Sequence, residues 1–218
     1  MTRARCVILL APLLLACAAS AQQPAQPPAP AEPTAAPVPV MSLTGQRIAI
    51  MPMTMVVADP ALSGDSVYAP WRDRRTALST ADSLIGDAFA GRAPEVKWVL
   101  PPELRKVARR SPGIVDDPDL MGQAVLRSPK LRQVPDPLRG SLRNLMALVG
   151  GRTVLVPASI GFGRQADGRV QADLTLVLAD VRNGHVLWRS VPRGAGATPR
   201  EALDAALAAA LPLDAGGP

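Results

Sequence analysis

Cysteine, histidine and aromatic residues are scarce in this 218-residue sequence. Both cysteines, Cys6 and Cys17, lie near the N-terminus, so the rest of the chain has no pair that could form a disulfide. The single histidine, His185, follows an Asn-Gly turn, and without a second His or Cys a zinc site would need carboxylates alone. One Tyr, two Phe and three Trp argue against an aromatic platform for sugars. We therefore predict neither a metal site nor a cofactor.

Common catalytic motifs are also missing: the sequence has no H-E-x-x-H, no G-x-S-x-G and no phosphate-binding loop. Residues 161–166 fit G-x-G-x-x-A, but a turn and another strand pattern follow where a dinucleotide site needs a helix. Residues 116–119 hold three aspartates without the alternating spacing of a calcium loop. We predict that the chain is not an enzyme and has no catalytic residues. A hydrolase is our third functional hypothesis, after the two given at the end of this section.

The sequence contains no apolar run of the ~20 residues that a membrane-spanning helix needs. Its longest early run, residues 7–15, follows a basic start and precedes small residues, which is typical of a secretory signal peptide over residues 1–21. Cleavage before Cys17 would leave a lipidated cysteine and a membrane anchor. Cleavage after Ala21 would release a free periplasmic protein. We expect the lipoprotein form, on the periplasmic face of the outer membrane, and keep the second site as the alternative.

A proline- and alanine-rich linker is predicted for residues 22–41, because this segment has no apolar face to bury. In extended polyproline II conformation, at ~3.1 Å per residue, it could reach roughly 60 Å. A disordered tail would have the same composition. We assign residues 42–214 to one globular domain and residues 215–218 to a tail.

The domain shows an alternation of strand and helix patterns. We expect strands at residues 47–51, 96–100, 153–160, 170–179 and 186–191, and helices at residues 77–89, 102–110, 120–126 and 138–149 and from Thr198 onward. The last helix begins with a capping box, and Asp-Gly and Asn-Gly pairs separate the last three strands. This order, β-α-β-α-(α)-α-β-β-β-α, predicts an α/β fold with helices packed on a mixed sheet. Residues 57–71 are expected to form a polar loop, and Gly91 to end the first long helix.

Four basic residues cluster on the short helix at residues 102–110, namely Arg105, Lys106, Arg109 and Arg110. They are candidates for contact with anionic lipid headgroups or an acidic partner, and a solvated helix face is the alternative. The net charge of +6 falls to +4 without Arg3 and Arg5, which is mild for a nucleic-acid binder, and we predict no nucleic-acid partner. The candidate aromatic anchors are Trp71, Trp98 and Trp188, of which the last two lie in predicted strands and are assigned to the core.

Three segments resemble a known group of envelope proteins. Residues 47–53 (RIAIMPM) resemble its first strand, residues 151–160 its central strand, and residues 176–188 (LVLADVRNGHVLW) its hairpin. The group comprises periplasmic and outer-membrane lipoprotein domains, among them the curli-secretion lipoprotein, the penicillin-binding-protein activator lipoproteins and the N-terminal domain of TolB. This sequence departs from the pattern at Pro157-Ala158, where a glycine is usual. The resemblance implies the same strand order and action through protein contacts.

We therefore expect an exported, lipid-anchored accessory module that binds another envelope protein without catalysis. A spacer and an anchor would raise its effective concentration near a membrane-bound partner. A periplasmic solute- or glycan-binding protein is the alternative, and it would need a concave pocket lined by aromatic and polar groups.

Overall fold

A computed structural model describes residues 36–211 of the chain. The predicted signal peptide, Cys17, most of the linker and the tail at residues 215–218 lie outside the described residues, and their assignments stay predictions. None of the helices within residues 36–211 is long and apolar enough to cross a membrane.

Strands and helices alternate in the order expected for an α/β fold, which the structure confirms. The strands are β1 (Arg47–Ile50), β2 (Val56–Ala58), β3 (Lys97–Val99), β4 (Thr153–Arg164), β5 (Val170–Asp180), β6 (Val186–Ser190) and β7 (Arg193–Gly196). The α-helices are α1 (Val40–Leu43), α2 (Pro60–Ser63), α3 (Arg74–Arg92), α4 (Pro101–Arg110), α5 (Leu138–Val149) and α6 (Pro199–Ala210). The remaining helical elements of the described residues are two 3-10 helices, η1 (Ser66–Trp71) and η2 (Gln123–Arg127).

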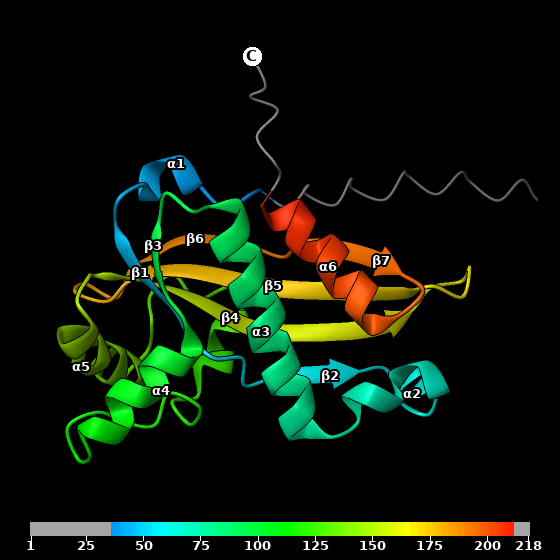
Figure 1. Ribbon diagram of the computed structural model, residues 1–218, viewed down its shortest axis with the longest axis horizontal. Helices are drawn as coiled ribbons and strands as arrows, with labels where there is room; N and C mark the ends of the chain where they lie inside the picture. The colour runs from blue at the N-terminus through cyan, green and yellow to red at the C-terminus, as the bar shows by residue number, and fades with distance from the viewer. Residues whose placement is uncertain (1–35, 212–218) are drawn as a thin grey trace, which may run out of the picture. The chain divides into compact units, whose positions relative to one another are not determined.

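Within residues 36–211 the seven strands form one mixed sheet with the order β3-β1-β4-β5-β6. Strands β1 and β2 pair with successive stretches of β4, and strands β7 and β6 pair with successive stretches of β5. Strands β1 and β2 run parallel to β4, whereas β5 is antiparallel to it and to β6 and β7. Helices α3 and α6 cross the front of the sheet, and α4 and α5 lie toward the β1–β3 end (Figure 1).

A bulge in β4 separates two registers of its pairing with β5. Pro157 pairs with Leu176, but the next pair is Ser159 with Thr175, so Ala158 is the extra residue. Without this extra residue, Ile160 and later apolar residues would point to the wrong face, since a slip of one residue reverses every side chain. The departure at Pro157-Ala158 therefore coincides with the point where the strand corrects its register.

The two faces of the sheet carry separate apolar cores. The front core joins β4 and β5 to α3, η1 and α6, and includes Phe89, Ile160, Phe162, Leu174 and Leu203. The back core lies between one half of the sheet and the α4, η2 and α5 layer, and includes Met51, Leu104, Leu126, Leu142 and Val156. Large apolar side chains that are fully buried in both cores explain why the domain needs no disulfide.

Helix α6 packs on β7 at two glycines. A Cβ atom on Gly194 would lie 2.1 Å from the Ala206 nitrogen, and one on Gly196 would lie 2.5 Å from the Glu201 Cβ. The predicted capping box starts this helix: the Thr198 hydroxyl accepts a hydrogen bond from the Glu201 N–H at 3.2 Å.

Several local predictions were wrong. Residues 57–71 are not a polar loop: they contain β2, α2 and η1, and Trp71 is buried against Phe162 with ring centroids 5.0 Å apart. Trp71 is thus a core residue and not an exposed anchor. Gly91 lies inside α3, and the helix ends at Arg92. Strand β7, whose four residues contain two glycines, was also not predicted.

The end of the predicted linker packs on the domain. Val38 is buried, and its N–H donates a hydrogen bond to the Ala210 oxygen at 2.9 Å. Trp98 and Trp188 are half-buried against the front core, as their strand positions predicted. The Trp98 ring stacks edge-on against Phe89 at 5.1 Å.

Candidate functional site

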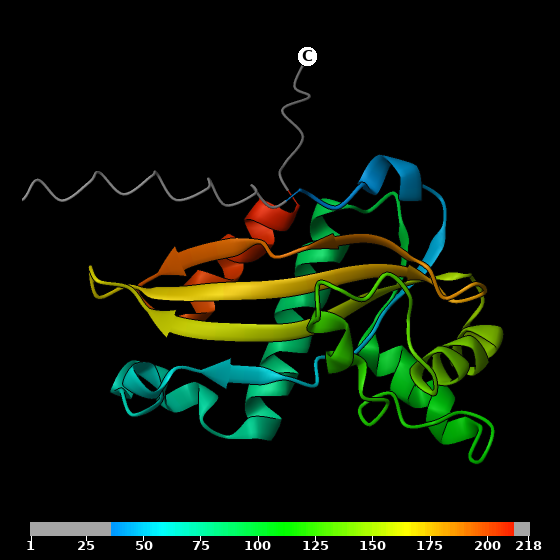
Figure 2. The ribbon, with the colours of Figure 1, turned by 180° about the vertical axis from the view of Figure 1, so that it is seen from behind.

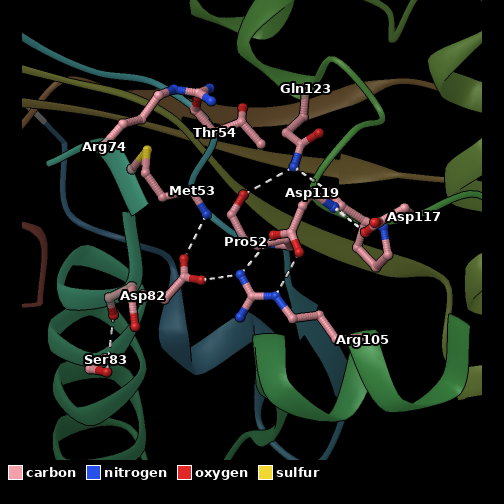
Figure 3. A network of polar contacts seen from close by, with 12 residues as sticks. Pro52, Met53, Thr54, Arg74, Asp82, Ser83, Arg105, Asp117, Asp119 and Gln123 are labelled. Carbon is pink, nitrogen blue, oxygen red and sulfur yellow. Dashed lines mark hydrogen bonds and ion pairs between the residues drawn. The ribbon is translucent and has the colours of Figure 1, made fainter. Parts of the chain in front are cut away.

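A charged network joins α3 to α4 beside the end of β1 (Figure 3). The Arg105 guanidinium donates to the Asp82 carboxylate at 2.5 Å and to both oxygens of Asp119 at 2.7 and 2.8 Å. Asp82 is on α3 and Asp119 is in the loop after α4, so one arginine links three segments. The fork-like contact with Asp119 is the geometry in which arginine binds carboxylate most firmly.

The same network holds the turn that follows β1. The Met53 N–H donates to the second oxygen of Asp82 at 2.6 Å. On the other side, the buried Gln123 amide donates to the oxygens of Pro52 and Pro118 at 3.0 and 2.8 Å (Figure 3). These bonds satisfy the buried Gln123 amide nitrogen and the two backbone oxygens, which would cost free energy if they were left unpaired. They fix the path of the chain from β1 to β2, opposite the bulge in β4.

Burial dominates the electrostatics of Asp82. Loss of water raises the pKa of this carboxyl above its ordinary value, although the Met53 N–H and Arg105 oppose the rise. The pKa of Arg105 is raised, chiefly by its hydrogen bond to Asp119, so the guanidinium stays charged. Every hydrogen bond that the structure shows for the Arg105 guanidinium goes to a residue of the chain itself, which indicates a structural clamp.

The four basic residues of α4 do not act as one group. Arg105 is turned inward into the network, whereas Lys106, Arg109 and Arg110 are exposed. Contact of Lys106, Arg109 and Arg110 with an anionic surface therefore stays a prediction. Arg105 could take part only through the exposed part of its side chain. Asp82 was not predicted from the sequence. It directly follows Ala81 and precedes Ile85 by three residues, and an aspartate on the apolar side of a helix was a usable signal.

Other candidate residues have ordinary places. His185 is exposed at the turn between β5 and β6, and residues 161–166 run from β4 into the β4–β5 hairpin with no helix start. Within residues 36–211 no group of three His, Cys, Asp or Glu side chains is close enough to hold a metal ion. Two depressions flank α4. One of about 310 Å³ lies at edge strand β3, and one of about 280 Å³ lies between Arg109 and the loop containing Asp117.

The half of the back face beyond the bulge has no helix over it (Figure 2). The β4–β5, β2–β4 and β5–β7 registers place three rows of side chains there. We call this surface the open face, and it consists of Val57, Ser159, Gly161, Gly163, Gln171, Asp173, Arg193 and Ala195, whereas Thr175, in the same rows, is buried. Apart from Val57, an apolar side chain that is 49% exposed, its side chains are small or polar.

Polar contacts run across the open face. The Gln171 amide donates to Asp173 at 2.8 Å, and Arg193 lies 3.3 Å from the same carboxylate. The Ser159 hydroxyl donates to the Thr175 hydroxyl at 3.2 Å. These contacts hold the side chains along the sheet and keep their hydrogen-bonding groups at fixed positions.

Gly161 lies at the middle of the open face, paired with Val57 on one side and Asp173 on the other. A Cβ atom there would meet nothing within 4 Å, and the backbone does not have a positive φ. Gly194 differs, because α6 fills the space above it. A glycine inside a strand costs roughly 0.5–1 kcal/mol relative to alanine, and nothing in residues 36–211 accounts for that cost at Gly161.

Comparison with known proteins yields structural likeness alone. No family model matches the chain, and no curated protein matches it. Similar solved structures include the LpoB C-terminal domain from Salmonella enterica, with 14% identity, TM-score 0.36, and coverage of 70% of this chain and 83% of that one. Lipoprotein GNA1162 from Neisseria meningitidis has 17% identity, TM-score 0.33, and coverage of 69% and 81%.

A third similar structure is the PelC dodecamer from Paraburkholderia phytofirmans, with 13% identity, TM-score 0.37, and coverage of 81% of this chain and 91% of that one. One of these neighbours, GNA1162, is named a lipoprotein, which is the kind of protein that the strand and hairpin motifs resemble. At these TM-scores and identities, function has to be argued from this chain's own residues.

Proposed function

We propose that this chain is an exported, lipid-anchored, non-enzymatic accessory module that binds another envelope protein through its open face. The partner would approach the sheet closely at Gly161 and offer hydrogen-bonding groups to Gln171 and Asp173. Export and anchoring are inferred from the signal-peptide pattern and from Cys17.

Gly161 is the observation that carries the proposal. In a strand, a glycine that no neighbouring side chain requires often marks a place where another backbone or a ligand comes close. None of residues 36–211 fills the space above Gly161. The small side chains and glycines near Gly161 would admit a segment of a partner protein, whereas a small solute would need a concave pocket.

Crosslinking in intact cells tests the proposal. A photoreactive residue at Val57, on the open face, should capture one defined envelope protein, and the same residue at Leu187, 54% exposed on β6, should not. Shortening the predicted spacer at residues 22–35 should reduce the Val57 product, because the effective concentration of the module near its partner falls. Equal capture at both positions, or capture of nothing with a small molecule co-purifying instead, would contradict docking at the open face.

Metabolic labelling tests the anchor separately. Labelled fatty acid should enter the wild-type protein and not a Cys17→Ala variant. If neither is labelled and the mature protein begins at Gln22, the protein is free in the periplasm, and the docking proposal stands without its anchor.

A further inference from the structure

The net positive charge of the described residues is confined to one part of the domain. Residues 97–152 contain 11 Lys and Arg against five Asp and Glu, whereas the remainder of residues 36–211 contains 11 of each. This segment comprises β3, α4, η2 and α5, and most of it forms the layer over the covered half of the back face. We call residues 97–152 the basic layer.

Three arginines of the basic layer are held in ion pairs, namely Arg105, Arg139 and Arg152. The other basic residues of the layer are exposed: Lys97, Lys106, Arg109, Arg110, Arg127, Lys130, Arg132 and Arg143. The excess charge therefore faces solvent, where it can act on an anionic partner.

The loop that follows α4 carries exposed apolar side chains, together with Asp116, Asp117 and Asp119. Leu120 is 80% exposed and Ile114 is 66% exposed, both in the loop that follows α4. Arg109 borders the same depression as Val115 and Asp117, so the end of α4 and this loop are adjacent. The Ser141 hydroxyl donates a hydrogen bond to Asp116, which ties α5 to the same corner. Both ribbon views place the end of α4, its following loop and α5 together (Figures 1 and 2).

We propose that the basic layer binds the surface of a membrane that contains anionic phospholipids. Lys106, Arg109 and Arg110 would contact headgroup phosphates, and Leu120 and Ile114 would enter the headgroup region. Exposed cations beside protruding apolar side chains are the combination that holds proteins at anionic interfaces. An acidic protein is the other partner that this charge would attract, and the vesicle experiment distinguishes it from a membrane. This surface is separate from the open face, so membrane contact leaves that face free for a protein.

Vesicle co-sedimentation tests the proposal with the unlipidated chain that begins at Gln22, so that only the protein contributes to binding. The chain should sediment with vesicles of phosphatidylethanolamine and phosphatidylglycerol, but not with vesicles of phosphatidylcholine. Binding should weaken as salt rises from about 0.05 to 0.5 M, because screening shortens electrostatic reach.

Charge-reversal variants locate the surface. Lys106→Glu with Arg110→Glu should weaken binding by roughly 30-fold or more, from about fivefold for each basic residue lost. The matched control is Arg75→Glu with Arg200→Glu, which changes net charge equally within the neutral part of the domain and should weaken binding only a fewfold. Leu120→Asn should weaken it by about tenfold, and Leu187→Asn, on the exposed part of β6, should not.

Circular dichroism melting curves would confirm that each variant is folded. Absence of binding to anionic vesicles at low salt would overturn the proposal. Equal losses in the two double variants would also overturn it, because binding would then follow net charge and not the basic layer. Binding to an acidic polypeptide, with none to anionic vesicles, would assign the layer to a protein partner and overturn membrane contact.

Discussion

The back face of the sheet has two halves, and the same two strands, β4 and β5, run through both. Before the bulge, their back-face residues are Val154, Val156, Val177 and Ala179, and the α4–η2–α5 layer covers them. After it, the back-face residues include Ser159, Gly161, Asp173 and Gln171, and no helix covers them. The front face is apolar from Leu155 to Phe162 in β4 and from Val170 to Leu178 in β5. Near-continuous apolar sequence thus marks strands buried on both faces, and alternation marks strands buried on one.

The two halves also differ in charge and in the role we propose for each. The covered half lies beneath a layer with an excess of basic residues, and the open half carries an ion pair between Asp173 and Arg193. This arrangement would let one module contact a membrane and a protein at the same time. The covered half should be sensitive to substitution because it is packed, and the open half should tolerate substitution in stability but not in binding.

The largest effect on stability is expected at the clamp between the covered half and α3. Arg105→Met should lower the free energy of unfolding by about 3–5 kcal/mol at pH 7, because it leaves the buried Asp82 carboxylate without its partner. Urea unfolding would measure this loss. The double variant with Asp82→Asn should recover part of it.

The Arg105→Met loss should depend on pH. Burial already raises the pKa of Asp82, and removal of the guanidinium raises it further. A carboxyl with a raised folded-state pKa destabilises the protein as pH rises above its unfolded value of about 3.9. The deficit should therefore be largest near pH 7 and smaller near pH 5. A deficit that does not change with pH would mean that Asp82 is not the affected group.

The next effect belongs to the core of the covered half. Leu142→Ala should cost about 2–5 kcal/mol, because this side chain is fully buried between α5 and the sheet. Leu148→Ala is the matched control on the same helix, where the side chain is 48% exposed, and it should cost less than about 1 kcal/mol. Similar losses in both variants would show that α5 is not packed as described.

A smaller effect is expected where α6 meets β7. Gly194→Ala should cost about 1–3 kcal/mol, because the added carbon meets the α6 backbone and the helix has to shift. Thermal melting would measure the change. Gly64→Ala, at the end of α2 with open space around it, is the control and should leave the melting temperature nearly unchanged.

Much of the fold could be predicted because it depends on local pattern. The periodicity at residues 138–149 gave α5 with its observed ends, and the Asn-Gly pair gave the β5–β6 turn, where Gly184 has a φ of 75°. Strands β2 and β7 escaped prediction because each is three or four residues long and is held by pairing with a distant strand. Such pairing depends on tertiary contacts that short sequence windows do not contain.

The candidate surfaces were harder to predict. The basic residues of α4 were visible in the sequence, but nothing showed that Arg105 would turn inward, since its partner Asp82 is 23 residues away. The G-x-G pattern at Gly161 and Gly163 was visible too, yet its meaning depended on which face the bulge directs it to. Sequence supplied the residues, and only the packed structure showed which are covered.

The most direct measurement of the central claim combines stability and docking in one variant, Gly161→Thr. If the space above Gly161 is kept for a partner, the free protein should become more stable by about 0.5–1 kcal/mol, and the Val57 crosslink in cells should be lost. Gly140→Ala, in α5 with open space around it, should raise stability by about as much and keep the crosslink. A Gly161→Thr protein that is more stable and still gives the crosslink would contradict docking at the open face.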